Sequence, residues 1–261
     1  MENKTLILAL GCTDGIVIGT DSASSDTSSG TKQPVLKIHQ IGNLPIVCGG
    51  SGDGGLIQKI HQQLEDEGDK LMGSNFMKTR KNIRRTVLLE QKDAKDNHLP
   101  QSQPFNEPPT ATFLFACIQN DTPFVLEIEV DARDTVYDKN YGSFTAIGSG
   151  KGLAQVAMRS HLYTERNLEA GKVIAYRVLE DSIDLAAAYL SKPIHLYTID
   201  LDKNVKKLSD EETSAVSASC GLWRQYERES LGKALAPSTV SDVSAPIPEP
   251  AEDPSASTPA E

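Results

Sequence analysis

Residues 5–21, which read TLILALGCTDGIVIGTD, contain the pattern that decides the fold. Two apolar runs of strand length, residues 5–10 and 16–21, flank the turn-forming residues 11–15, with Asp14-Gly15 at the centre. An Asp-Gly pair between two apolar runs is a strong signal of a β-hairpin. Because both runs are apolar at successive positions, we expect both faces of their sheet to be covered.

The rest of the chain predicts clusters of strands separated by pairs of helices. Further strands are predicted at residues 34–41, 43–48, 112–118, 123–129, 144–150, 193–199 and 205–208. Helices are predicted from residue 56 onward after the glycine-rich stretch 49–55, and at residues 75–96, 152–164, 173–190 and 209–235. This order favours antiparallel sheets with helices outside them over a regular βαβ alternation.

Composition narrows the classes of function. The chain has 261 residues and a formal net charge of −10, which argues against nucleic acid or an anionic membrane as the main partner. The sequence has no apolar stretch long enough to span a bilayer and no signal peptide, so we expect a cytoplasmic protein. Its four cysteines form no CxxC pair and its five histidines are scattered, so we predict buried free thiols, no metal and no cofactor.

The C-terminal residues differ in composition from the rest of the chain. Residues 236–261 are rich in Pro, Ser, Ala and acidic residues and contain no aromatic residue. Such a segment cannot bury enough apolar surface to offset the loss of chain entropy on folding. We therefore predict a folded domain over residues 5–235 and a disordered tail over residues 236–261.

Three residues at fixed separations link the chain to a known family. Asp21 follows Thr5 by sixteen positions, and Lys37 follows Thr5 by thirty-two. A glycine-rich turn from a strand into a helix is predicted at residues 46–52, and a second such turn, Gly-Ser-Gly, at residues 146–150. In these residues the chain resembles the proteasome β-subunits and their bacterial relative, the HslV-type peptidase. The resemblance covers roughly residues 5–207.

This resemblance implies an α+β fold, a four-layer αββα sandwich of two antiparallel sheets flanked by helices, as in N-terminal-nucleophile hydrolases. It implies a threonine-type peptidase that hydrolyses unfolded proteins inside a homo-oligomeric ring, with a related subunit or an ATPase unfoldase as candidate partners. It assigns catalytic roles to Thr5, Asp21, Lys37 and Ser149. It assigns oxyanion or substrate binding to Ser51, Gly50, Gly52 and Ser25.

The implied chemistry explains why these residue types are needed. A threonine hydroxyl is a poor nucleophile and needs a base, which can be its own α-amine when the threonine is N-terminal. The ammonium of Lys37 would lower the pKa of that amine, and Asp21 would hold the lysine. Residues 1–4 would then be a short leader that must be removed to free the amine of Thr5.

Two departures from the family pattern leave alternatives open. Lys4 is an unusual residue before the nucleophile, and residues 187–193 offer Ser191 but no aspartate, the nearest being Asp184. A catalytically silent structural subunit would explain both departures. An amidase or transpeptidase with one specific substrate would keep the fold and the acyl-enzyme but change the reaction.

Overall fold

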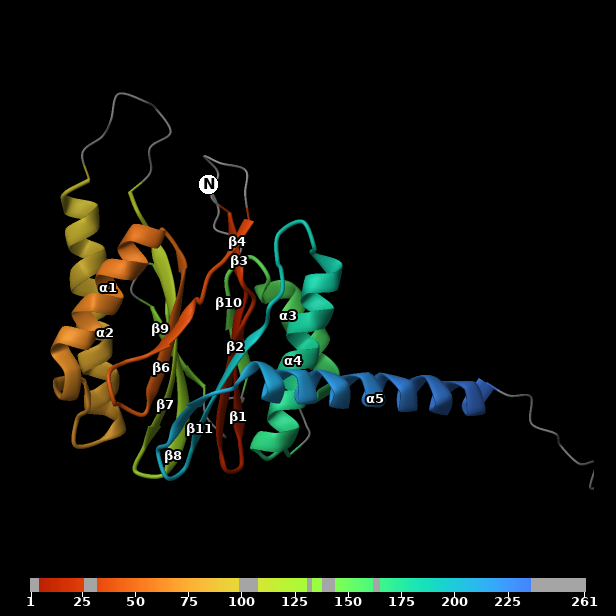
Figure 1. The fold of residues 1–261 in the computed structure, drawn as a ribbon. Coiled ribbons are helices and arrows are strands. Elements are labelled where there is room, and N and C mark those ends of the chain that lie inside the picture. The colour runs from red at the N-terminus through yellow and green to blue at the C-terminus, as the bar shows by residue number, and fades with distance from the viewer. Residues whose placement is uncertain are drawn as a thin grey trace, which may run out of the picture. The chain divides into compact units, whose positions relative to one another are not determined.

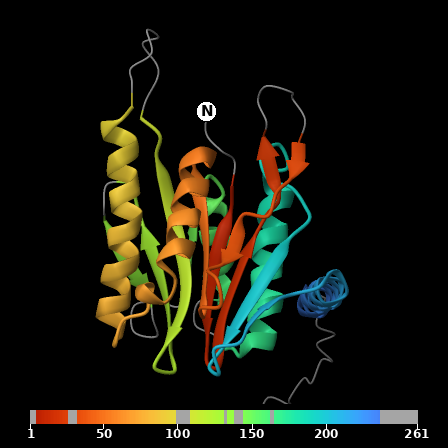
Figure 2. The same cartoon turned by 60° about the vertical axis from the view of Figure 1, so that its left-hand side comes forward.

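The protein is built from two antiparallel sheets that lie face to face between layers of helices (Figures 1 and 2). The structure, a computed structural model, describes residues 5–25, 32–98, 108–130, 133–137, 144–161 and 165–235. The expected α+β sandwich is confirmed.

The strands form two five-stranded sheets and one small ribbon. The first sheet has the order β10 (Phe144–Ile147), β1 (Ile7–Cys12), β2 (Gly15–Thr20), β11 (His195–Asp200) and β12 (Val205–Lys207). The second sheet has the order β5 (Ile38–Gln40), β6 (Ile46–Gly52), β7 (Ala111–Gln119), β8 (Thr122–Ile128) and β9 (Asp134–Tyr137). The ribbon pairs β3 (Ala23–Ser25) with β4 (Lys32–Pro34).

Each large sheet is covered on its outer face by two helices. Helices α1 (Gly54–Glu67) and α2 (Phe76–Asp96) pack on the second sheet, with the 3-10 turn η1 (Gly68–Leu71) between them. Helices α3 (Lys151–Met158) and α4 (Leu168–Leu185) pack on the first sheet, with the 3-10 turn η2 (Arg159–His161) between them. The last helix is α5 (Asp210–Leu235).

Strand β1 shows why its sequence is apolar at every position. Leu8 and Leu10 point to the core beneath α3 and α4, whereas Ile7 and Ala9 point to the core between the two sheets. All four side chains are fully buried, and burying a leucine or isoleucine side chain contributes roughly 1.5–3 kcal/mol. The expectation of a sheet covered on both faces is confirmed.

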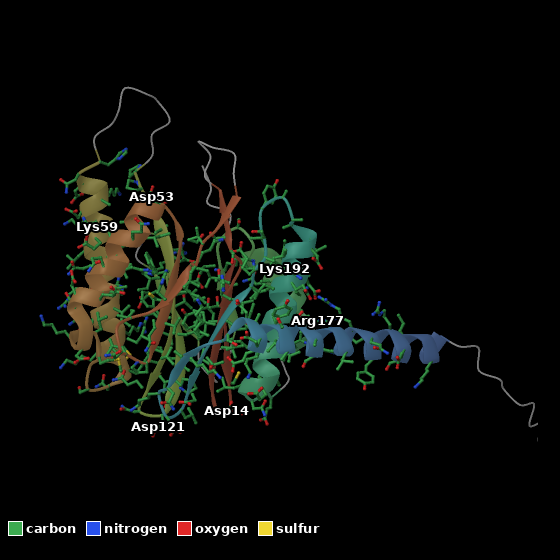
Figure 3. All side chains as sticks on the ribbon, in the orientation of Figure 1. Asp14, Asp53, Lys59, Asp121, Arg177 and Lys192 are labelled. Atoms are coloured by element: carbon green, nitrogen blue, oxygen red, sulfur yellow. The ribbon has the colours of Figure 1, made fainter. Side chains whose placement is uncertain are left out.

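The predicted hairpin is present, but its turn is tighter than expected. Cys12 pairs with Gly15, so the loop contains only Thr13 and Asp14 rather than residues 11–15. The Asp14 carboxylate accepts a hydrogen bond of 2.7 Å from the backbone N–H of Leu168, which fixes the turn to the start of α4. Figure 3 places this turn at the same end of the sandwich as Asp121, which turns β7 into β8.

Several predicted bounds are wrong. The predicted strand over residues 34–41 is interrupted, because β4 ends at Pro34 and β5 begins only at Ile38. Residues 49–52, expected as a turn, are the end of strand β6, because each pairs with a residue of β7. Helix α4 covers Leu168–Leu185 rather than residues 173–190. Strand β9 was not predicted.

The last helix begins as predicted. The Ser209 hydroxyl accepts a hydrogen bond from the backbone N–H of Glu212, and the Glu212 carboxylate accepts one from the N–H of Ser209, which together form a capping box. The chain divides into two compact units, Met1–Trp223 and Arg224–Glu261. Within the first unit, the Trp223 ring packs against the ring of His161. The predicted tail over 236–261 lies outside the described residues.

The cysteines agree with the sequence expectation of buried thiols. All four lie in the described part of the chain and are buried, and burial raises the pKa of Cys12 to about 12. Among the described residues, no group of three or more His, Cys, Asp or Glu side chains is arranged to hold a metal ion. No helix in the described ranges is long and apolar enough to cross a bilayer.

We predict that His61 makes the fold sensitive to acid. The imidazole packs against Cys48 and His39, and burial lowers its pKa to about 4, with the His39 charge adding to the shift. Its unfolded pKa is about 6.5, so the unfolded chain takes up a proton first as the pH falls. The free energy of unfolding should therefore drop by up to about 3 kcal/mol between pH ~6.5 and ~4.

Urea unfolding across this range of pH measures the effect. His61→Leu should flatten the slope of unfolding free energy against pH, because leucine does not titrate. Gln62→Leu, on the exposed side of the same helix, should keep the slope of the wild-type protein. Equal slopes for His61→Leu and the wild-type protein would contradict the assignment.

Candidate active site

The predicted site residues meet at the end of the sandwich opposite the Asp14 turn. Thr5 stands just before β1 and Asp21 just after β2, and the antiparallel register pairs Ile7 with Thr20. Strand β6 ends nearby, and Asp53, which follows it and caps α1, is labelled at this end in Figure 3. The β1–β2 pairing therefore brings positions 5 and 21 to this end of the sandwich, where β6 of the other sheet brings position 51.

The Asp21 carboxylate joins two segments at this end of the sandwich. The side chain is fully buried, and its Oδ1 atom accepts a hydrogen bond of 2.9 Å from the backbone N–H of Leu6. The same oxygen forms an ion pair of 2.7 Å with Lys37 Nζ. The backbone N–H of Asp21 also donates to the Leu6 carbonyl at 3.2 Å. Lys37 is thus attached to the residue directly after Thr5.

The β3–β4 ribbon explains how a residue thirty-two positions after Thr5 returns to it. The ribbon leaves β2 at Ser22 and comes back beside it, where the N–H of Val35 donates to the Ser22 carbonyl at 3.1 Å. The Lys37 side chain is only 9% exposed. Burial lowers the pKa of Lys37, and the Asp21 carboxylate opposes that shift by favouring the ammonium.

A glycine-serine turn closes the other side of Thr5. Ser149 Oγ lies 3.2 Å from the backbone nitrogen of Thr5, which donates to it, and the N–H of Gly150 donates to the Thr5 carbonyl at 3.2 Å. Gly148 has a φ of 89°, and a Cβ atom there would lie 2.1 Å from the Thr5 carbonyl oxygen. Only glycine fits this close approach.

Of the residues predicted for oxyanion or substrate binding, Ser51 has a side chain that lies against the turn at Gly148. Its Oγ atom lies 3.1 Å from the Cβ position of Gly148, which itself abuts Thr5. Gly50 lies on the opposite face of β6, where an added Cβ would meet Ile57 of α1. Gly52 is next to Ser51 in the strand and abuts the Thr110 carbonyl.

The structure therefore brings together five of the predicted residues: Thr5, Asp21, Lys37, Ser51 and Ser149. Ser25 lies in β3 opposite Lys32, and its side chain lies outside what the structure describes. Ser22, whose side chain is fully buried, was not predicted from the sequence. Its N–H donates to the Ser191 carbonyl at 2.9 Å and its hydroxyl donates to the Pro193 carbonyl. In the sequence, the position of Ser22 directly after Asp21 was the signal that could have identified it.

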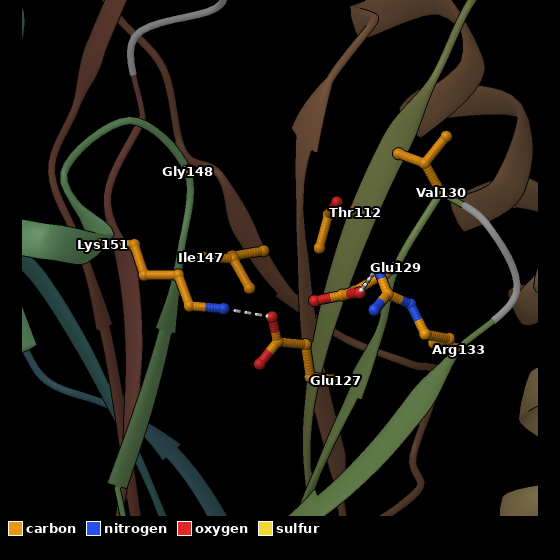
Figure 4. A pocket seen from close by; sticks show the side chains of 8 residues that line it. All are labelled: Thr112, Glu127, Glu129, Val130, Arg133, Ile147, Gly148 and Lys151. Atoms are coloured by element: carbon orange, nitrogen blue, oxygen red, sulfur yellow. Dashed lines mark hydrogen bonds and ion pairs between the residues drawn. The ribbon is translucent and has the colours of Figure 1, made fainter.

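A cavity adjoins the Gly148 side of the site. It has a volume of about 360 Å³, and Figure 4 shows the residues around it. Its lining consists of Thr112, Glu127, Glu129, Val130, Arg133, Ile147, Gly148 and Lys151. Thr112 pairs with Ser51 across the β6–β7 ladder, so the cavity begins one residue from the predicted oxyanion site.

Two antiparallel sheets between helical layers have the architecture of the N-terminal-nucleophile hydrolase fold. The family model for proteasome subunits matches residues 1–199, and the chain belongs to the proteasome subunit family. The chain is similar in structure to a mutant of Anbu from Hyphomicrobium sp. strain MC1. The TM-score is 0.67 at 13% sequence identity, over 88% of this chain and 97% of that one. A search of curated proteins gave no match.

We predict that Gly148→Ala disrupts the packing around Thr5. The new methyl group would overlap the Thr5 carbonyl, and alanine at this positive φ adds backbone strain, so unfolding should become easier by more than about 2 kcal/mol. Gly152→Ala is the matched control, since nothing lies within 4 Å of its Cβ position in α3. The control should gain about 0.5–1 kcal/mol, because alanine favours helix. Urea unfolding of both variants checks this, and equal effects would contradict it.

Proposed function

We propose that this chain is a threonine-type peptidase whose nucleophile is Thr5 once residues 1–4 have been removed. The observation that carries the proposal is the Asp21 carboxylate, which is bonded both to Lys37 Nζ and to the backbone N–H next to Thr5. A buried lysine held beside the N-terminal residue is the arrangement that this chemistry requires. Membership of the proteasome subunit family supports the same reaction.

In the proposed reaction, the free amine of Thr5 takes the proton of its own hydroxyl, directly or through one water. The Lys37 ammonium favours the neutral amine at neutral pH because like charges repel. The Thr5 oxygen then attacks the scissile carbonyl, and backbone N–H groups near Ser51 donate to the oxyanion. The amine returns the proton to the leaving group, which leaves an ester on Thr5, and water hydrolyses that ester.

Ser149 has a supporting role in this proposal. Its hydroxyl lies 3.2 Å from the nitrogen of Thr5, which is a peptide nitrogen while residues 1–4 are attached. Once that nitrogen is an amine, the same hydroxyl can orient it toward the nucleophilic oxygen. The unfolded-protein substrate, the homo-oligomeric ring, the related subunit or ATPase unfoldase as partner and the cytoplasmic location belong to the same proposal.

The mature N-terminus provides the first test. We expect intact-mass analysis of the purified protein to show a chain that begins at Thr5 and that hydrolyses an unstructured protein. Thr5→Ala should retain residues 2–4 and lose activity by at least about 1,000-fold, because no nucleophile remains. Thr5→Ser should keep both processing and measurable hydrolysis, since its hydroxyl takes the same role.

A wild-type mass that retains residues 2–4, with no hydrolysis, would overturn the peptidase and leave a structural subunit. Hydrolysis that persists in Thr5→Ala would place the nucleophile elsewhere. Turnover of small amides without any cleavage of unstructured protein would favour the amidase or transpeptidase reaction.

A second prediction concerns Lys37. Lys37→Met should lower kcat by at least about 100-fold, because removing the ammonium raises the pKa of the Thr5 amine and leaves Asp21 without its ion-pair partner. Lys81→Met, at an exposed position on α2, should leave kcat unchanged. Steady-state hydrolysis of a fluorogenic peptide by the processed protein measures both, and similar kcat values would contradict a role for Lys37.

A further inference from the structure

A second buried carboxylate lies on the other side of the turn that contacts Thr5. Glu127 is in β8 and is 2% exposed. Its Oε1 atom pairs with Lys151 Nζ at 2.7 Å, which Figure 4 marks with a dashed line. Its Oε2 atom accepts hydrogen bonds of 3.0 Å from the hydroxyls of Tyr137 and Thr145. Three donors from β9, β10 and α3 therefore meet at one carboxylate.

The lining of the neighbouring cavity does not indicate a binding site for a charged ligand. Glu127 and Glu129 are balanced by Lys151 and Arg133, so the lining has no net charge. Glu129 and Arg133 form their own pair at 3.2 Å, and both side chains are exposed to solvent. Glu127 is different, because burying a carboxylate is costly unless several donors compensate it.

The donors of Glu127 lie at both ends of the Gly-Ser-Gly turn. Thr145 is in β10 before the turn, and Lys151 is the first residue of α3 after it. The backbone N–H of Lys151 donates to the Gly148 carbonyl at 3.0 Å, which closes the turn itself. Between these two anchors, Ser149 contacts the nitrogen of Thr5 and Gly150 donates to its carbonyl.

We propose that Glu127 is a positioning residue for Thr5, acting through the turn at residues 148–150. Its carboxylate holds both ends of the turn and so fixes the distance between Ser149 Oγ and the Thr5 nitrogen. The effect on the reaction rests on the proposed function of Thr5, whereas the effect on the turn does not. Glu127 does not touch the reacting atoms, so substrate binding should be nearly independent of it.

The test compares Glu127→Gln with Glu129→Gln in the processed protein. Glutamine keeps the volume of Glu127 but removes the charge that holds Lys151. We expect kcat on a fluorogenic peptide to fall by about 10- to 100-fold while KM changes by less than about two-fold, because a small displacement of reacting groups costs mainly rate. Glu129 follows the same strand by one residue and lines the same cavity, and Glu129→Gln should change neither parameter.

Lys151→Met gives a second route, because it removes the ion-pair partner of Glu127 at a side chain that is itself 35% exposed. It should reproduce the loss of kcat. The double variant Glu127→Gln/Lys151→Met should cost no more than either single variant, because both changes remove one shared interaction.

Amide hydrogen exchange can be measured on an inactive protein, so it tests the role of Glu127 independently of the proposed function. Amide hydrogen exchange by NMR should be faster for Gly150 in Glu127→Gln by about tenfold or more, while Leu6, bonded to Asp21, keeps its wild-type rate. If the wild-type protein is inactive but Gly150 exchange responds as stated, only the proposed function fails. If Gly150 exchange is unchanged in Glu127→Gln, or if Glu129→Gln has the same effect, the positioning role is overturned.

Discussion

The candidate site depends on two interactions of the Asp21 carboxylate, a hydrogen bond from Leu6 and an ion pair with Lys37. A carboxylate with no exposed surface has to be compensated, and losing one partner of a buried pair costs about 3–5 kcal/mol. Asp21 satisfies this condition with the backbone N–H of Leu6, just before β1, and with Lys37. The start of β1, the end of β2 and the segment that follows the β3–β4 ribbon are therefore held in one arrangement.

Glu127, in the second sheet, is likewise a buried carboxylate whose charge is compensated by several partners. Asp21 fixes the segment on one side of Thr5, and Glu127 fixes the turn on the other through Thr145 and Lys151. The two carboxylates come from different sheets, so the position of Thr5 depends on how the two sheets pack. The core between them, with Ile7 of β1 and Val125 of β8, is thus part of what aligns the site.

The sequence predicted the parts of this arrangement that arise from local patterns. The hairpin that carries Thr5 and Asp21 has a turn signal between two apolar runs, and the spacing to Lys37 matches a known family. Residues 49–52 were misjudged because glycine favours turns locally, whereas pairing with β7 extends β6 through them. Glu127 had no local signal, because its partners lie 10, 18 and 24 positions away and meet only through sheet packing.

The single tryptophan determines which part of this molecule fluorescence can report on. Trp223 contacts the His161 ring on one side, and the Arg177 guanidinium lies over it at 4.4 Å from the ring centroid. These neighbours belong to η2 and α4, in the helical layer of the first sheet. Its emission therefore follows the packing of residues 210–223, the first part of α5, on that layer. A rearrangement confined to Thr5, Lys37 or the 148–150 turn would leave this tryptophan emission unchanged.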